Sequence, residues 1–343
     1  MDVPTRPASS TDRPPLADAL RSAVIVNPVK VPDLDLLRRT IDDALTAAGW
    51  PEPMWLETTV DDPGSGQTSQ AVRDGAQLVF ACGGDGTVMA CVTALAGTDV
   101  ALAVLPAGTG NLLATNLGLT GDVAAAIEVV LEGGRRRIDV GSVGAQCFAV
   151  MAGMGFDAHM LDATSDTAKK RIGWLAYAVG AAQHLRDRPM RIRITLDGRR
   201  PFTRRPRTVI VGNVGRLQGG VRLLNDAQPD DGLLDVAVLS PRNLRHWISL
   251  GWGVLRRKDA ISNMETFTAS RVEILSTRIQ PRQLDGDLIE PSKELLVTVW
   301  PKALLLCVPH PDTDLDLAHD AAAADRRAER LRSGPARVVS TTV

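Results

Sequence analysis

The stretch LVFACGGDGTVMACV, residues 78 to 92, places three glycines and an aspartate between two apolar runs. A strand that simply passes into a helix does not need such residues. Glycine allows a backbone to take unusual angles or to approach another group closely. Gly83, Gly84 and Gly86 therefore indicate a loop that admits a ligand near the main chain. The stretch predicts a strand, a glycine-rich turn and a helix, in that order.

Short apolar strands and helical patterns alternate along the first part of the chain. The strand at 22–28 is halted by Asn27-Pro28, and an amphipathic helix is expected from Leu34 to Ala48. Further strands are predicted at 54–59, 77–84 and 100–108, and further helices at 67–76, at 87–96 and from Asn111 onward. This alternation predicts βαβ units around a parallel sheet. Such sheets bind ligands at the carboxyl ends of their strands, where the glycine-rich turns fall.

From about residue 136 the pattern changes to short β-rich runs interrupted by Gly, Pro and Asp, with helical patterns near 170–186 and 243–257. A mainly antiparallel β domain fits this pattern. The domain organisation that we expect is a disordered lead-in at 1–20, an α/β domain at 21–135, a β domain at 136–300, and a late strand that packs back, with a loosely held or disordered tail, at 301–343.

Length, charge and cysteine content narrow the class of protein. A chain of 343 residues is long for one core, so two domains are expected. Its 39 basic and 40 acidic side chains create no overall field that would attract nucleic acid, and no nucleic-acid partner is expected. The four cysteines fall in apolar runs without metal-ligand spacing, which predicts buried thiols in a cytoplasmic protein. We predict neither a secretory signal nor a membrane-spanning run.

A second glycine-rich turn follows the strand after the first one. LPAGTGNLLATNLGL, residues 105 to 119, places Gly108, Thr109, Gly110 and Asn111 between an apolar strand and a helix. Backbone N–H groups and the helix dipole favour an anion at each turn. Two such turns, one βα unit apart, would lie side by side, so a polyphosphate is expected and a nucleotide outranks a monophosphate. Neither turn matches the P-loop or the Rossmann fingerprint.

Asp85 does not suit direct contact with phosphate, because like charges repel. One interpretation is that Asp85 holds Mg²⁺ or another part of the ligand. The alternative is a tight turn in which Asp85 caps the following helix.

The motifs VIVNP, CGGDGTV, LPAGTGNLLA and QLDGD occur in the order found in the diacylglycerol kinase catalytic family. That family includes bacterial lipid kinases, sphingosine kinases and ceramide kinase, and the similarity extends from about residue 22 to 310. The resemblance implies a parallel α/β domain and an antiparallel β-sandwich domain with ATP between them. By the same resemblance, the nucleotide site comprises Asn27, Gly83, Gly84, Asp85, Gly86, Thr87, Gly108, Thr109, Asn111 and either Thr58 or Thr59.

LLNDAQPDDGLLDVAVL, residues 223 to 239, gathers Asp230, Asp231 and Asp235 around a glycine-containing turn. Carboxylates and nearby carbonyls can bind a hard cation, and a solvated hairpin turn is the alternative. Bacterial members of the family hold a structural Mg²⁺ with the equivalent segment. The resemblance therefore implies Asp231 and Asp235 as metal ligands, with Asp230 as a neighbour.

QLDGDLIEP, residues 283 to 291, places Asp285 and Asp287 on either side of Gly286. The family usually has DGE here, and its first aspartate is the proposed base that takes the proton of the lipid hydroxyl. The resemblance thus assigns catalytic roles to Asp285, Asp287 and Asp85. Asp287 is one methylene shorter than the usual Glu. NPVKVPD also departs from the glycine-containing loop of many relatives, which affects the expected adenine or ribose contacts.

The resemblance predicts an ATP-dependent lipid kinase that uses Mg²⁺ and phosphorylates diacylglycerol or a related lipid. The alternatives are an NAD kinase, whose family shares GGDGT, and a nucleotide-binding or lipid-binding protein with weakened catalysis. The Trp- and Arg-containing segment 241–259 suits peripheral contact with an anionic membrane, or an ordinary helix that covers the sandwich. The oligomeric state stays open, with a homodimer as one option.

Overall fold

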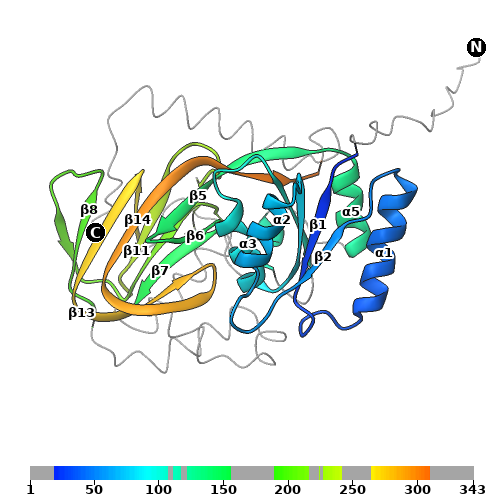
Figure 1. Ribbon diagram of the computed structural model, residues 1–343. Coiled ribbons are helices and arrows are strands. Elements are labelled where there is room, and N and C mark those ends of the chain that lie inside the picture. Colours follow the sequence, from blue (N-terminus) through cyan, green and yellow to red (C-terminus); the bar gives the residue numbers. More distant parts are fainter. Residues whose placement is uncertain are drawn as a thin grey trace, which may run out of the picture.

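The computed structural model describes residues 19–106, 111–116, 122–155, 189–215, 224, 227–241 and 264–309. The predicted lead-in, the helical patterns at 170–186 and 243–257 and the tail after 309 lie outside these residues. The labelled helices gather around strands such as β1 and β2 at one end of the molecule, whereas the other end consists of strands (Figure 1). In the described part of the chain, no helix is long and apolar enough to cross a membrane.

The α/β part contains a parallel sheet in the order β4-β3-β1-β2. Its strands are β1 (Ser22–Val26), β2 (Met54–Glu57), β3 (Leu78–Gly83) and β4 (Ala101–Pro106). Its helices are α1 (Leu34–Ala47), α2 (Ser65–Arg73), α3 (Asp85–Leu95), α4 (Leu112–Asn116) and α5 (Val123–Leu131). The predicted alternation of strands and helices is confirmed, although the sequence patterns gave no expectation for α5.

Helices cover both faces of this sheet, so its strands are apolar throughout rather than alternating. In β1, Val24 and Val26 face the core formed with α1 and α5, whereas Ile25 belongs to the core formed with α3. The buried side chains of α1 recur at helical spacing, at Leu37, Ile41 and Leu45. Because both faces are covered, a ligand can reach the sheet only at the strand ends.

The rest of the described chain is β-rich. Its strands are β5 (Arg135–Val143), β6 (Gln146–Phe148), β7 (Met151–Gly155), β8 (Ile192–Leu196), β9 (Phe202–Arg204), β10 (Thr208–Gly212), β11 (Leu234–Leu239), β12 (Met264–Ala269), β13 (Arg271–Leu284) and β14 (Asp287–Cys307). Apart from the parallel contact between β14 and β4, their pairings are antiparallel, including the order β12-β11-β10-β7-β13-β14. The predicted α/β domain followed by an antiparallel β domain is therefore confirmed.

Strand β14 belongs to both parts, and Figure 1 shows it sweeping from one part to the other. Its first portion pairs with β13, and its last portion pairs in parallel with β4 through Leu305 and Leu306. Between them, the pairing with β5 shifts register between Trp300 and Leu304, and Lys302 has a positive φ of 51°. One strand thus joins the parallel and antiparallel parts into a single continuous sheet.

The apolar core is also continuous across the junction. Val88 and Val92 of α3 lie in the same buried cluster as Ile138 of β5, Met151 of β7 and Leu304 of β14. The N-terminus of α3, which carries the first glycine-rich turn, is therefore fixed relative to the β domain.

Candidate active site

The GGDGT turn joins β3 to α3, and its first two glycines differ in the space around them. A Cβ on Gly83 would lie 2.5 Å from Oγ1 of Thr87 and 2.6 Å from its Cβ, so only glycine lets this buried threonine pack there. A Cβ on Gly84 would meet no atom within 4 Å. Gly84 is the N-cap of α3 and provides no side-chain cap. The turn therefore leaves open space in front of helix N–H groups, as a phosphate requires.

The two glycine-rich turns begin on neighbouring strands, because Gly83 of β3 is paired in register with Pro106 of β4. Oδ1 of Asp85 accepts a hydrogen bond from the backbone N–H of Leu112 at 2.8 Å. Asn111 caps α4 by accepting from the N–H of Ala114 at 2.9 Å. Asp85 therefore lies at the start of α3 but bonds to the start of α4. The expected nucleotide contacts Gly108 and Thr109 lie outside the described residues.

Asn27 and the two candidate threonines lie at the ends of the adjoining strands. The backbone N–H of Asn27 donates to the carbonyl of Cys82 at 2.9 Å, and its Oδ1 accepts from the N–H of Val29 at 3.1 Å. Thr58 is buried and its N–H donates to the carbonyl of Val26, whereas Thr59 is exposed and its hydroxyl accepts from the N–H of Asp62. These residues share the carboxyl edge of the sheet with GGDGT, and their nucleotide contacts stay predictions.

A turn from the β domain reaches this edge. Leu284 and Asp287 form the last pair of β13 and β14, and the two residues between them have positive φ angles, 47° for Asp285 and 98° for Gly286. Asp-Gly is the usual sequence for such a tight hairpin. A Cβ on Gly86 would lie 3.0 Å from Oδ2 of Asp287, which places this exposed carboxylate against the first turn of α3. The turn containing the predicted base therefore meets the predicted phosphate turn.

Asp285 is 6% exposed, and its carboxylate accepts three backbone hydrogen bonds. Oδ1 accepts from the N–H groups of Val150 at 2.9 Å and Met151 at 2.7 Å, and Oδ2 accepts from the N–H of Ala149 at 2.8 Å. The pKa of Asp285 is raised from 3.8 to about 7, mainly because burial disfavours the ionised carboxylate; the three N–H donors oppose this shift and the negative charge of Asp85 adds to it. Asp285 therefore exchanges its proton near neutral pH.

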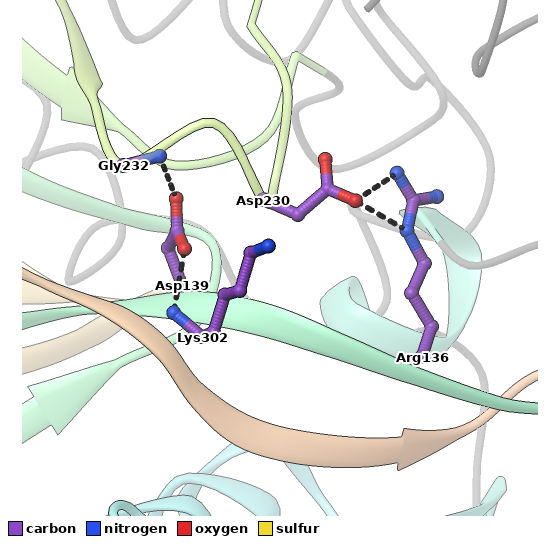
Figure 2. Close-up of polar contacts among 5 residues, drawn as sticks. All are labelled: Arg136, Asp139, Asp230, Gly232 and Lys302. Atoms are coloured by element: carbon purple, nitrogen blue, oxygen red, sulfur yellow. Dashed lines mark hydrogen bonds and ion pairs between the residues drawn. The ribbon is translucent and has the colours of Figure 1, made fainter.

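The turn at residues 230–232 before β11, called the acidic turn below, is held in place by a residue that the sequence patterns did not single out (Figure 2). Asp139 on β5 is fully buried, and its carboxylate accepts from the backbone N–H groups of Gly232 and Lys302. Burial raises the pKa of Asp139, which these two N–H groups oppose. Asp230 makes a separate ion pair with Arg136 at 3.1 Å. Asp139 thus ties the acidic turn to the register shift of β14. Its only signal in the sequence is one carboxylate between two apolar residues, Ile138 and Val140.

Asp231 and Asp235, the predicted magnesium ligands, are part of the acidic turn and of β11 respectively. Oδ1 of Asp231 accepts from the N–H of Leu233 at 3.0 Å, and Oδ1 of Asp235 accepts from the hydroxyl of Thr268 at 3.3 Å. Carboxylates suit Mg²⁺. Among the described residues, however, no three His, Cys, Asp or Glu side chains form a group that could hold a metal. The magnesium site stays a prediction, and no chemical step below depends on it.

All four cysteines are free and buried, as predicted. Burial raises the pKa of Cys91 and of Cys307 to about 12, so these thiols stay protonated at neutral pH. A thiol without thiolate character is a poor nucleophile.

Solved structures share this architecture. A diacylglycerol kinase crystal structure from Bacillus anthracis str. Sterne superposes with a TM-score of 0.65 at 20% sequence identity, over 86% of this chain and 99% of that one. An NAD kinase from Archaeoglobus fulgidus, in complex with ATP, gives a TM-score of 0.50 at 12% identity, over 89% of this chain and 99% of that one. At these identities the likeness establishes the fold, which is that of the diacylglycerol kinase and NAD kinase class.

Family models and curated relatives define the family more narrowly than the fold does. The diacylglycerol kinase catalytic domain matches residues 21–143, and the YegS C-terminal NAD kinase beta sandwich-like domain matches residues 150–308. The diacylglycerol kinase of Bacillus subtilis is 30% identical over 65% of this chain and 76% of that protein. A protein of Chromohalobacter salexigens named probable lipid kinase YegS-like is 32% identical over 70% of this chain and 78% of that protein. The chain belongs to the family of diacylglycerol kinases and YegS-like lipid kinases.

The matched share of the relatives varies. A diacylglycerol kinase of Mycobacterium tuberculosis is 33% identical over 174 residues, which are 49% of this chain and 56% of that protein. The chain thus matches little more than half the length of this relative.

Proposed function

We propose that the protein is an ATP-dependent lipid kinase that transfers the γ-phosphoryl group to a hydroxyl of diacylglycerol or a related lipid. The observation that carries the proposal is the meeting of Asp287 with Gly86 at the N-terminus of α3. This contact brings the carboxylate turn of the β domain to the glycine-rich turn that also contains Gly84, where a Cβ would meet no atom within 4 Å. Phosphoryl transfer needs a phosphate anchor, an adjacent acceptor and a positioned base, and this arrangement offers candidates for each.

In this proposal the two glycine-rich turns hold the phosphates, through Gly83, Gly84, Gly86 and Thr87 in one turn and Gly108, Thr109 and Asn111 in the other. Asn27 and Thr59 lie toward the nucleoside. Asp85 holds the two turns together through Leu112. Magnesium bound with ATP would neutralise phosphate charge, and Asp231 and Asp235 are the candidate ligands of a separate structural ion.

Asp285 is the proposed base. Its Oδ1 accepts two N–H groups, whereas its Oδ2 accepts one and keeps a lone pair for the proton of the lipid hydroxyl. A pKa near the working pH suits a group that takes up a proton during the reaction and later releases it. Asp287, which is exposed beside Gly86, would face the transferred group.

The second candidate function is that of an NAD kinase, because the NAD kinase of Archaeoglobus fulgidus has the same fold. The match to the diacylglycerol kinase catalytic domain favours the lipid acceptor. A third candidate is a binding protein with weakened catalysis, since Asp287 replaces the usual Glu. We also propose a cytoplasmic location with peripheral membrane contact. Segment 241–259 would make that contact, and all of it after residue 241 lies outside the described residues.

The direct test offers radiolabelled ATP with a panel of lipids in mixed micelles and, separately, with NAD. The proposal predicts label in a hydroxyl-bearing lipid such as diacylglycerol and none in NADP. Label in NADP alone would support the NAD kinase. If no acceptor is labelled although ATP binds, the protein is a binding module.

A further inference from the structure

Asn213 follows β10 and lies against the segment that holds Asp285. Its side chain is 1% exposed. Its backbone N–H donates to the carbonyl of Val150 at 2.8 Å, and its Nδ2 donates to the carbonyl of Ala149 at 3.0 Å. Residues 149–151 are thus held by Asn213 on one side and by Asp285 on the other.

The bonds of Asn213 and Asp285 meet on the same peptide groups. The carbonyl of Ala149 and the N–H of Val150 belong to one peptide group, whose oxygen accepts from Asn213 and whose N–H donates to Asp285. The next group has the same arrangement, with the carbonyl of Val150 bonded to Asn213 and the N–H of Met151 bonded to Asp285. Because a peptide group is planar and rigid, fixing its oxygen fixes the direction of its N–H.

Asn213 is itself held in one orientation. Its Nδ2 also donates to the carbonyl of Asp139 at 2.7 Å, so each amide hydrogen has an acceptor. The carboxylate of Asp139 in turn holds Gly232 and Lys302 (Figure 2). A continuous chain of hydrogen bonds therefore extends from the register shift of β14 to the carboxylate of Asp285.

We propose that Asn213 is a positioning residue for Asp285, an inference that rests on the lipid kinase function proposed above. It touches neither substrate nor nucleotide. It aligns the peptide groups of residues 149–151, and these set the orientation and the proton affinity of the Asp285 carboxylate. Among the described residues, the charged group that bears on this affinity is Asp85 on α3. Removing an aligned N–H donor disfavours the ionised carboxylate and raises its pKa.

The test compares three variants of the full chain. Asn213→Leu removes both side-chain donors at similar volume, and Asn213→Ser keeps a hydroxyl that can donate to one carbonyl. Thr208→Val is the matched control, because Thr208 lies at the other end of β10 and donates to the carbonyl of Met154 on the same neighbouring strand. Each variant is assayed for kcat and for KM for ATP across pH, and amide hydrogen exchange is measured at Val150 and Met151.

Asn213→Leu should lower kcat by about 10- to 100-fold, with KM for ATP within about twofold, and should move the acidic limb of the pH profile upward. Asn213→Ser should lie between Asn213→Leu and the wild type. The Val150 N–H should exchange faster while the Met151 N–H changes little, because the backbone N–H of residue 213 still holds the second peptide group. Thr208→Val should change neither kcat nor these exchange rates.

The proposal is overturned if kcat in Asn213→Leu equals that of Thr208→Val, or if Val150 exchange is unchanged. If Asn213→Leu does not fold, the same comparisons are made with Asn213→Ser. If the wild-type chain labels no lipid, the proposed function fails, whereas the exchange rate at Val150 still decides whether Asn213 holds this peptide group.

Discussion

The carboxylate of Asp85 accepts a hydrogen bond from the backbone N–H of Leu112 at 2.8 Å, which ties the first turn of α3 to the first turn of α4. Both of these helices follow a glycine-rich turn. The bond therefore sets the spacing between the two turns proposed to hold phosphates. The negative charge of Asp85 also raises the pKa of Asp285.

Asp85→Asn should separate these two effects. The amide oxygen can still accept from Leu112, but the charge is lost, so the pKa of Asp285 falls. We expect the acidic limb of the kcat profile to move to lower pH, with KM for ATP nearly unchanged. Asp85→Ala, which removes the acceptor as well, should raise KM for ATP. An unchanged pH profile in Asp85→Asn would show that Asp85 and Asp285 are not coupled.

Substitutions at Gly83 and Gly84 should affect different properties, namely stability at Gly83 and ATP affinity at Gly84. A Cβ on Gly83 collides with Thr87, so Gly83→Ala should lower the thermal midpoint. A Cβ on Gly84 meets no atom within 4 Å, so Gly84→Val should fold normally but fill the space proposed for a phosphate. Its KM for ATP should rise about tenfold or more, equivalent to about 1.4 kcal/mol. Wild-type ATP affinity in folded Gly84→Val would place the phosphates elsewhere.

Activity and stability should depend on pH in opposite directions through Asp285. As a base it must be ionised, so kcat/KM should fall as pH decreases below about 7. Folding raises this pKa above its ordinary value of 3.8, so the contribution of Asp285 to stability is present at low pH and is lost as pH rises toward 7. The pH–rate profile and thermal midpoints measured across the same range check both trends. A rate that stays constant down to pH 5 would exclude Asp285 as the base.

Asp139→Asn should destabilise the junction of the two domains. An amide can accept from only one of Gly232 and Lys302 and places an N–H₂ group against the other donor. Leaving a buried donor unpaired costs about 1–3 kcal/mol, which urea unfolding measures. Asp99→Asn is the control, because the ion pair of Asp99 with Arg137 is exposed and should contribute little. Equal midpoints for the two variants would show that Asp139 does not stabilise this junction.

Local patterns predicted the elements of the α/β part other than α5, and the neighbouring positions of the two turns. Leu37, Ile41 and Leu45 show helical spacing, and turns on adjacent parallel strands must share one edge. The continuity of β14 could not be predicted in this way. Pro301 indicates a break, yet it lies where the pairing with β5 shifts register, a position that tolerates proline within a sheet.

Sequence patterns also did not identify Asp139 and Asn213, the residues that hold the site in place. Asp139 lies between Ile138 and Val140, Asn213 follows the apolar strand β10, and the partners of both are far away in the sequence. The contacts of Asn213 with Asp139 and Ala149 join residues 74 and 64 positions apart. Only the folded chain brings these groups together, so their roles follow from the hydrogen bonds rather than from any motif.

The central claim is that this site phosphorylates a lipid with Asp285 as the base. The most direct measurement is transfer of label from radiolabelled ATP to diacylglycerol in mixed micelles by the wild type and by Asp285→Asn, with ATP affinity measured on both. The amide removes the basic oxygen, and its N–H₂ group would face an N–H donor of residues 149–151. We predict lipid labelling by the wild type and a kcat lower by about 10²- to 10⁴-fold in the variant, with ATP affinity retained. Near-normal kcat in Asp285→Asn, or no labelled lipid with the wild type, would contradict this account.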